Sequence, residues 1–278
     1  MESESFWLKV IAYLDTNFFN WLADQSVAAV SIAFARNRRF NAPVSLTVLA
    51  EILATPDGVR RRKLLGLAFD VCDKASVLKP VHELLIDEIK ASFAAERSNP
   101  FLPSDSGQKL LSYYSRLLLD EGARARERAD IEQRTQSWKS AFGSFHDALR
   151  TIDPDFTRKT IAPSFQEHFA GLAPAFAKDW ACRAGIPDGF EPSVLLNNRP
   201  VRVGIRYALA CDWDHKYGPR DDRPVEASDA RDLQHAILAA AACDVLVVCD
   251  RIFKSRLERV RVEHLQILDF GEFVARVL

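Results

Sequence analysis

The first apolar run of the chain predicts a buried β-strand. Residues 6–14 (FWLKVIAYL) are almost continuously apolar and rich in strand formers, and the run stops at Asp15. A run of this kind is typical of a central strand that is covered on both faces. Helical patterns follow over 18–24 and 26–37, and the segment Pro43–Leu46 then predicts a second, short strand.

Strands and helices then continue to alternate. Apolar residues at helical spacing predict a helix that carries Glu51, and Pro56–Gly58 is predicted to be a turn. A helix over 59–72 and a strand near Val77–Leu78 follow. Strands and helices that alternate at this spacing favour the α/β class with a parallel sheet.

The middle of the chain has a helical pattern. Apolar residues fall on one helical face over 110–118 and again over 131–149. Residues 165–180 keep the same rhythm, but Gly171 and Pro174 are expected to break that helix, because glycine and proline are the poorest helix formers. We therefore predict a mostly helical insertion in the middle of the chain.

The α/β pattern returns after the insertion. A helix that is apolar on nearly all sides precedes residues 245–249 (VLVVC), which predict a short buried strand that ends before Asp250. A helix, a strand and a last helix close the chain. The predicted organisation is one α/β domain formed by residues 1–95 and 201–278, with the helical insertion over 96–200.

Composition excludes several classes of protein. With 37 Lys and Arg against 38 Asp and Glu, the formal net charge is −1, so any nucleic acid would have to bind to local basic patches. Five cysteines without a CxxC pair are expected to be reduced thiols. The acidic N-terminus differs from a signal peptide, and the longest apolar run, 236–249, is too short to span a membrane. We therefore expect a soluble, cytoplasmic protein with no membrane partner.

Four acidic residues are predicted to meet at one edge of the sheet. Asp15 and Asp250 each follow a buried strand, and Asp232 lies near the start of the helix that leads into the second of these strands. Glu51 lies about one turn into the helix that follows the strand at 43–46. Because sites in open parallel sheets form at the carboxyl ends of the strands, the four carboxylates should face one crevice.

Such a cluster favours a divalent cation. Carboxylates that crowd together repel one another and raise each other's pKa, and a bound cation would relieve this repulsion. Mg²⁺ and Mn²⁺ prefer oxygen ligands and keep water molecules in their shell. A cation bound in this way is equipped to hydrolyse a phosphodiester.

Each of these acids also has a structural interpretation. Asp15 is a candidate turn residue or helix N-cap, and Glu51 a candidate solvated helix residue. Asp229 is a candidate N-cap, with Asp232 as the acid in the first turn of the same helix. His235 is interpreted as a packed core residue rather than a ligand.

Together, these segments resemble the PIN domain family. The matching pieces are VIAYLDTN, PVSLTVLAEIL, SDARDLQHAILAAAACDVLVVCDRIF and the terminal VEHLQILDFGEFVARVL. The resemblance covers residues 6–95 and 225–278, and it rests on the order of the pieces rather than on any one motif.

The resemblance implies a three-layer α/β/α fold around a central parallel sheet, and a metal-dependent nuclease, most often a ribonuclease. The residues that align with the Mg²⁺- or Mn²⁺-binding acidic tetrad of active members are Asp15, Glu51, Asp232 and Asp250. Asn17 matches the polar residue that supports the first aspartate, and Asp229 would be an additional acid. RNA is the expected substrate and DNA an alternative, and PIN-like domains often form homodimers.

The sequence departs from the family pattern at two points. Cys249 stands before the last aspartate, where many members have threonine, and the long insertion is atypical of the short toxin-type members. One alternative is a non-catalytic PIN-like module that binds RNA or a protein partner. Another is a phosphatase of the haloacid dehalogenase type, which expects a second aspartate at the position of Asn17.

Two local basic clusters are candidates for guiding a nucleic acid backbone toward the acids. One comprises Arg36, Arg38 and Arg39, and the other spans residues 60–63 (RRRK). A solvated helix face explains each cluster equally well.

Overall fold

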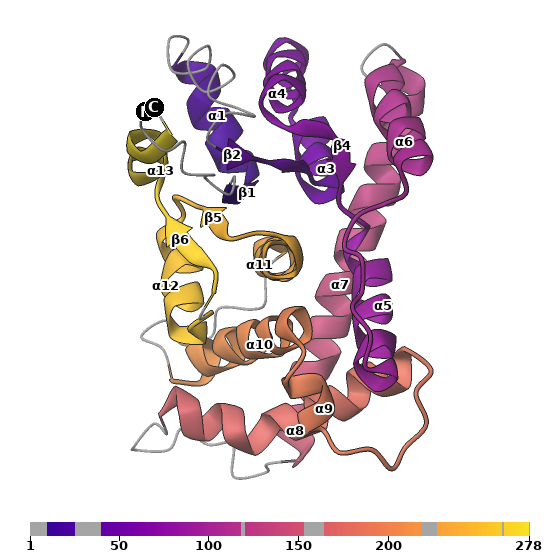
Figure 1. Cartoon of the computed structure of the whole chain (residues 1–278), viewed down its shortest axis with the longest axis vertical. Helices are drawn as coiled ribbons and strands as arrows, with labels where there is room; N and C mark the ends of the chain where they lie inside the picture. Colours follow the sequence, from indigo (N-terminus) through magenta and orange to yellow (C-terminus); the bar gives the residue numbers. More distant parts are fainter. Residues whose placement is uncertain are drawn as a thin grey trace, which may run out of the picture.

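The structure is a computed structural model that describes residues 10–25, 40–117, 120–152, 164–217, 227–262 and 264–277. The helix predicted over 26–37 and the basic cluster at 36–39 lie outside these residues, as does the start of the first predicted strand. Figure 1 shows how the described helices and strands are arranged.

A four-stranded parallel sheet lies at the centre of the α/β part. In spatial order its strands are β2 (Phe40–Asn41), β1 (Val10–Leu14), β5 (Val245–Val247) and β6 (Gln266–Leu268). A second parallel pair joins β3 (Pro43–Val44) to β4 (Asp73–Val77). The predicted α/β class with a parallel sheet is therefore confirmed.

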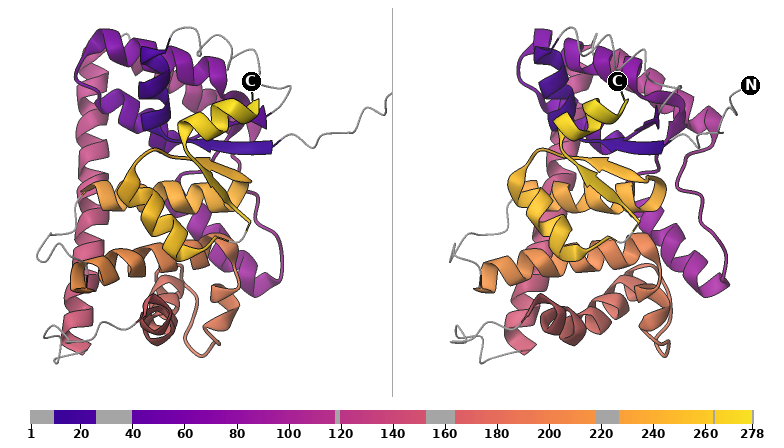
Figure 2. Two further views of the ribbon diagram at one scale, coloured as in Figure 1. Left: turned by 90° about the vertical axis from the view of Figure 1, so that its left-hand side faces the viewer. Right: turned by 60° about the vertical axis from the view of Figure 1, so that its left-hand side comes forward.

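Helices lie on both sides of these strands (Figures 1 and 2). The helices of the N-terminal part are α1 (Thr16–Asp24), α3 (Leu46–Ala54), α4 (Gly58–Val71) and α5 (Val81–Ala94). The C-terminal part contributes α10 (Arg199–Tyr217), α11 (Ala227–Ala242), α12 (Arg251–Val260) and α13 (Phe270–Val277). In Figure 1, α1 and α4 lie above the strands, whereas α10, α11 and α12 lie below them.

The middle of the chain forms helices, as its apolar pattern predicted. They are α6 (Ser104–Leu117), α7 (Glu121–Ile152), α8 (Phe165–Arg183) and α9 (Ser193–Leu196). α7 packs against α11 and α3, and α8 packs against α10. In Figure 1, α7 runs along one side of the molecule from the level of α6 to the level of α9. The middle helices therefore rest on the helices that flank the sheet.

Local chemistry explains two differences from the predicted elements. The strand predicted over Pro43–Leu46 ends at Val44, because the Ser45 hydroxyl accepts a hydrogen bond from the Val48 amide at 3.4 Å and caps α3. α8 is continuous through Gly171 and Pro174, so the predicted break is wrong. The buried face of α8 packs against α10, and this packing outweighs the hydrogen bond that proline cannot donate.

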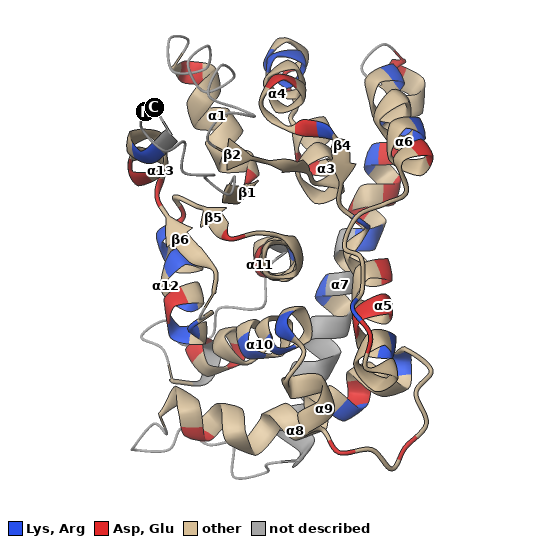
Figure 3. Ribbon diagram, viewed as in Figure 1, with Lys and Arg blue, Asp and Glu red and all other residues tan. Residues whose placement is uncertain are grey.

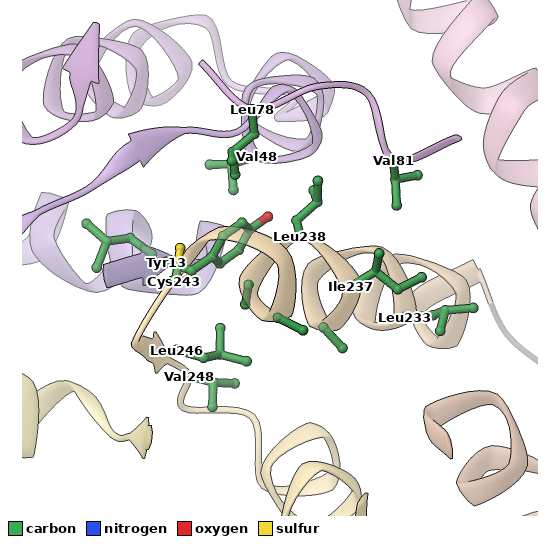
Figure 4. Packing of buried hydrophobic residues seen from close by; sticks show 14 of the residues in the cluster. Tyr13, Val48, Leu78, Val81, Leu233, Ile237, Leu238, Cys243, Leu246 and Val248 are labelled. Carbon is green, nitrogen blue, oxygen red and sulfur yellow. The ribbon is translucent and has the colours of Figure 1, made fainter. Parts of the chain in front are cut away.

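The core sits between the sheet and the helix α11. Tyr13 and Leu14 of β1 and Leu246 of β5 are buried, and α11 is buried on nearly all sides, as its apolar sequence predicted. Figure 4 shows the side chain of Leu238, on α11, directed toward Val48 of α3. This packing fixes α11 and α3 relative to β1.

Among the helices in the described part of the chain, none combines the length and the apolar composition that a membrane crossing requires.

Candidate functional site

Two aspartates lie at the carboxyl ends of neighbouring strands. Asp15 directly follows β1, and Asp250 follows shortly after β5. The two strands are paired in parallel, with Leu14 opposite Val247, so both aspartates come to the same edge of the sheet. This is the edge at which open parallel sheets place their sites.

Both aspartates also cap helices. The Asp15 Oδ1 atom accepts a hydrogen bond from the Phe18 amide at 2.8 Å, and the Asp250 Oδ1 atom accepts one from the Phe253 amide at 2.8 Å. The capping role that the sequence offered for Asp15 is therefore real. Because each cap engages Oδ1, the backbone holds both carboxylates in a fixed orientation.

One pocket of about 320 Å³ collects the predicted site residues. Its lining includes Asp15, Asn17, Glu51, Asp229, Asp232 and Asp250. The side chains come from the ends of two strands and from α1, α3 and α11. The structure thus brings all six residues together, although the chain separates them by more than two hundred positions.

Burial and crowding disturb the ionisation of two of these acids. Burial, with a smaller contribution from the nearby Glu51 carboxylate, raises the pKa of Asp15 to about 7 against the opposing effects of His235 and the Phe18 amide. Burial likewise raises the pKa of Asp232 to about 7, with added repulsion from Asp250 and Asp229 and an opposing effect of His235. The pocket is therefore an unfavourable place for several negative charges at once.

Glu51 has the densest set of partners in the pocket. Thr16 Oγ1 donates a hydrogen bond to the Oε2 atom, and His235 Nε2 lies 3.2 Å from the same oxygen. Arg231 Nη1 lies 3.7 Å from Oε1. Burial would raise the pKa of Glu51, but His235, Thr16 and Arg231 outweigh it and lower the pKa. Glu51 is therefore not a solvated helix residue.

Asp229 is neutralised by a buried arginine. Arg256 Nη1 lies 2.6 Å from Asp229 Oδ1, and Arg256 Nε lies 2.9 Å from Asp214 Oδ2. The helix α11 begins at Ala227, so the interpretation of Asp229 as its N-cap is wrong. Since its Oδ1 is held in an ion pair, Asp229 is a weaker candidate for a metal ligand than the other acids.

His235 is buried, as the sequence interpretation predicted, and it also lines the pocket, which that interpretation did not foresee. It lines the pocket with 4% of its surface exposed, and its Nδ1 atom lies 2.7 Å from the Tyr13 hydroxyl. Burial lowers the pKa of His235, but Glu51, Asp15 and Asp232 outweigh it and raise the pKa. The available signal was its position three residues after Asp232, which places both side chains on one face of α11.

The basic cluster at 60–63 is a candidate for guiding a nucleic acid backbone, but three of its residues bind other parts of the protein. Arg60 pairs with Asp24 at 3.0 Å, and Arg61 Nη1 donates to the Thr55 carbonyl at 2.6 Å. Lys63 donates to the Ala23 carbonyl. These bonds tie α4 to α1 and to the end of α3.

Figure 3 shows acidic and basic residues interspersed along α7, where Arg124 pairs with Glu121 at 3.1 Å.

The oxygen donors of the pocket fit a hard divalent cation, although the ligands are not preassembled. Within the described ranges, no three His, Cys, Asp or Glu side chains are grouped so as to hold a metal ion as they stand. Carboxylates are nevertheless the ligands that Mg²⁺ and Mn²⁺ prefer, and a bound cation would relieve the repulsion of Asp15 by Glu51 and of Asp232 by Asp250. The residues that could hold it are Asp15, Glu51, Asp232 and Asp250.

Comparison of the chain with protein-family models, with curated proteins and with solved structures finds no match.

Proposed function

We propose that this protein is a Mg²⁺- or Mn²⁺-dependent nuclease that hydrolyses phosphodiester bonds in RNA. One observation carries the proposal: Asp15, Glu51, Asp232 and Asp250 line a single pocket at the carboxyl ends of parallel strands. The parallel strand order β2-β1-β5-β6, with helices on both sides, supports a PIN-like three-layer fold. That the protein forms a homodimer, as the resemblance to PIN domains implies, stays a prediction.

The residues of the pocket would have different roles in such a reaction. Asp15, Asp232 and Asp250 would hold the cation, with Glu51 bound to it directly or through water. When bound, the cation supplies a water of lowered pKa and stabilises negative charge on the phosphate oxygens. The backbone amides that bind Asp15 and Asp250 keep these two carboxylates oriented before the cation arrives.

Other side chains are suited to binding the substrate. Arg231 lines the pocket with its side chain 41% exposed, and a guanidinium binds phosphate oxygens well. Asn17 also lines the pocket, and its side-chain amide can hydrogen-bond to sugars or bases. No covalent intermediate with the protein is needed, because the attacking group is water.

A second candidate function is a non-catalytic RNA- or protein-binding module. It is favoured by the ion pairs already present in the pocket, between Glu51 and His235 and between Asp229 and Arg256. These pairs compensate part of the acidic charge without a cation. A binding module of this kind would bind Mn²⁺ weakly or without turnover.

The two candidates are separated by measuring Mn²⁺ binding and cleavage on the same preparations. We expect wild type to bind Mn²⁺, seen as a rise in melting temperature, and to cleave single-stranded or structured RNA. Asp250→Asn should lose both effects. The matched control is Asp269→Asn, since Asp269 follows β6 and caps α13 at 2.8 Å but does not line the pocket. Mn²⁺ binding without cleavage of any RNA or DNA would favour the binding module.

A further inference from the structure

A row of buried polar groups runs from the core to the pocket. Ser45 Oγ lies 2.9 Å from the Tyr13 hydroxyl, which lies 2.7 Å from His235 Nδ1. The other ring nitrogen of His235 lies 3.2 Å from Glu51 Oε2. Ser45, Tyr13 and His235 are all buried, so only the last member of the row, Glu51, is half-buried at the pocket.

The chemistry of these groups fixes the direction of the last hydrogen bond. An ionised carboxylate only accepts, so the His235 Nε2 atom must carry a hydrogen and donate it to Glu51. The Nδ1 atom faces a hydroxyl, which donates to a neutral ring and accepts from a charged one. Tyr13 therefore satisfies Nδ1 in either state, with Ser45 as the partner of the Tyr13 hydroxyl. The ring keeps its Nε2–H bond directed at Glu51 throughout.

Glu51 requires side-chain partners because no backbone cap can orient it. Asp15 and Asp250 stand at helix starts, where amides hold their carboxylates at 2.8 Å. Glu51 lies in the interior of α3, and its longer side chain has more rotamers to restrict. His235 and Thr16 both bind Oε2, which fixes the plane of the carboxylate and leaves Oε1 near Arg231 at 3.7 Å.

A purely structural role explains the row poorly. Phenylalanine and leucine would fill the places of Tyr13 and His235 without burying three polar groups that each need a partner. The edge-to-face contact of the two rings, with centroids 5.6 Å apart, would survive the loss of the hydroxyl. The hydroxyl of Tyr13 and the ring nitrogens of His235 are therefore explained by the hydrogen bonds that they pass on to the Glu51 carboxylate at the end of the row.

We propose that Tyr13 and His235 are positioning residues that orient the Glu51 carboxylate for the cation of the pocket. The proposal rests on the proposed function, since it assigns these residues a role at the same cation site. Groups that orient metal ligands from outside the coordination shell typically affect metal affinity or activity by about 10–100-fold. Tyr13 and His235 should therefore affect Mn²⁺ binding without contributing a ligand.

Tyr13→Phe provides the mildest test, because it removes one oxygen and keeps the ring. We expect the Mn²⁺ concentration for half-maximal cleavage to rise by about 10-fold, with KM for RNA unchanged. The Mn²⁺-induced rise in melting temperature should weaken in parallel, which gives a readout independent of activity. The matched control is Tyr114→Phe, since Tyr114 is a buried tyrosine of α6 that does not line the pocket. It should leave both Mn²⁺ readouts unchanged.

Two substitutions of His235 distinguish the roles of its two ring nitrogens. Glutamine places its amide near the Nε2 position and can still donate to Glu51, whereas asparagine reproduces Nδ1 and reaches only Tyr13. The proposal predicts that His235→Gln keeps tighter Mn²⁺ binding than His235→Asn. Equal Mn²⁺ affinity of the two variants, at equal melting temperature in EDTA, would contradict it.

A combination with Glu51→Gln shows whether Tyr13 acts through Glu51. In the Glu51→Gln background, Tyr13→Phe should cause no further loss of Mn²⁺ affinity. A full, additive loss would overturn the proposal. If wild type binds Mn²⁺ and cleaves RNA, and Tyr13→Phe changes neither property, the positioning role is overturned while the proposed function stands. If wild type neither binds Mn²⁺ nor cleaves RNA, the proposed function fails and the positioning role falls with it.

Discussion

Arg256 Nη1 lies 2.6 Å from Asp229 Oδ1, and both side chains are buried. The same guanidinium contacts Asp214 of α10 through its Nε atom at 2.9 Å. One arginine of α12 thus joins α10 to α11 at Asp229, a residue that lines the pocket. This relationship makes the pocket dependent on α10, which lies beyond the middle helices in the chain.

Removing this arginine should destabilise the protein strongly. Arg256→Met keeps most of the volume but leaves the buried Asp229 carboxylate without this arginine, whereas Asp214 keeps its ion pair with Arg259, so we expect a loss of about 3–5 kcal/mol of unfolding free energy. Denaturant unfolding measures it. The control is Arg183→Met, which breaks an exposed pair with Asp179 and should cost less than about 1 kcal/mol. Similarly small losses of unfolding free energy in both variants would mean that the buried ion pairs of Arg256 do not stabilise the protein.

Charge removal in the pocket should not harm the metal-free protein. In EDTA, Asp232→Asn should leave the melting temperature unchanged or raise it, because burial and neighbouring acids disfavour the ionised form. Mn²⁺ should then stabilise the variant less than wild type. Asp269→Asn, outside the pocket, should respond to Mn²⁺ like wild type. A large drop for Asp232→Asn in EDTA would show that its charge is stabilised by pairing instead.

The metal-free protein should lose stability as the pH rises. The pKa of both Asp15 and Asp232 is raised from 3.8 to about 7 in the folded state. The folded protein therefore binds more protons than the unfolded chain between these values, and stability falls across this window. The raised pKa of His235 acts in the same direction, since its stabilising contribution is also lost at higher pH.

Denaturant unfolding in EDTA at pH 5 and pH 8 measures this effect. The drop between the two pH values should be smaller for the double variant Asp15→Asn, Asp232→Asn than for wild type. Equal drops in wild type and variant would contradict the shifted pKa values.

Close packing of the helices beneath the sheet should make alanine at Gly204 destabilising. A Cβ atom at Gly204 would lie 2.7 Å from Trp180 Cη2 and 3.0 Å from Ile237 Cδ1. Overpacking should outweigh the helix-forming advantage of alanine, so Gly204→Ala is expected to cost about 1–2 kcal/mol. Gly171→Ala, with no atom within 4 Å, should instead gain about 0.5–1 kcal/mol. A gain in both variants would show that the helices can separate.

The strand-end acids were predictable because their signals are local. A run of apolar residues covered on both faces marks a buried strand, and Asp15 and Asp250 each end such a run. The rule that parallel strands present their carboxyl ends at one edge then brings the two together. The placement of Glu51 and Asp232 at the same edge was predicted from their short distance along the chain to a strand.

The partners of these acids could not be predicted, since they depend on how helices pack. Nothing in the sequence places Tyr13 opposite His235 or sets Tyr207 of α10 at 3.4 Å from Asp232. The break expected at Pro174 failed for a related reason, because burial of one face of α8 outweighs local propensity. Propensity describes a segment alone, whereas these features belong to contacts between segments.

Cleavage of RNA by purified wild type and Asp250→Asn, with and without Mn²⁺, tests the nuclease proposal most directly. The account predicts Mn²⁺-dependent cleavage by wild type and by Asp269→Asn, and none by Asp250→Asn or in EDTA. Because water is the proposed nucleophile, the products should carry no 2′,3′-cyclic phosphate, which distinguishes them from those of a contaminating ribonuclease that uses the 2′-hydroxyl. Absence of cleavage, or cleavage that persists in Asp250→Asn, would contradict the account.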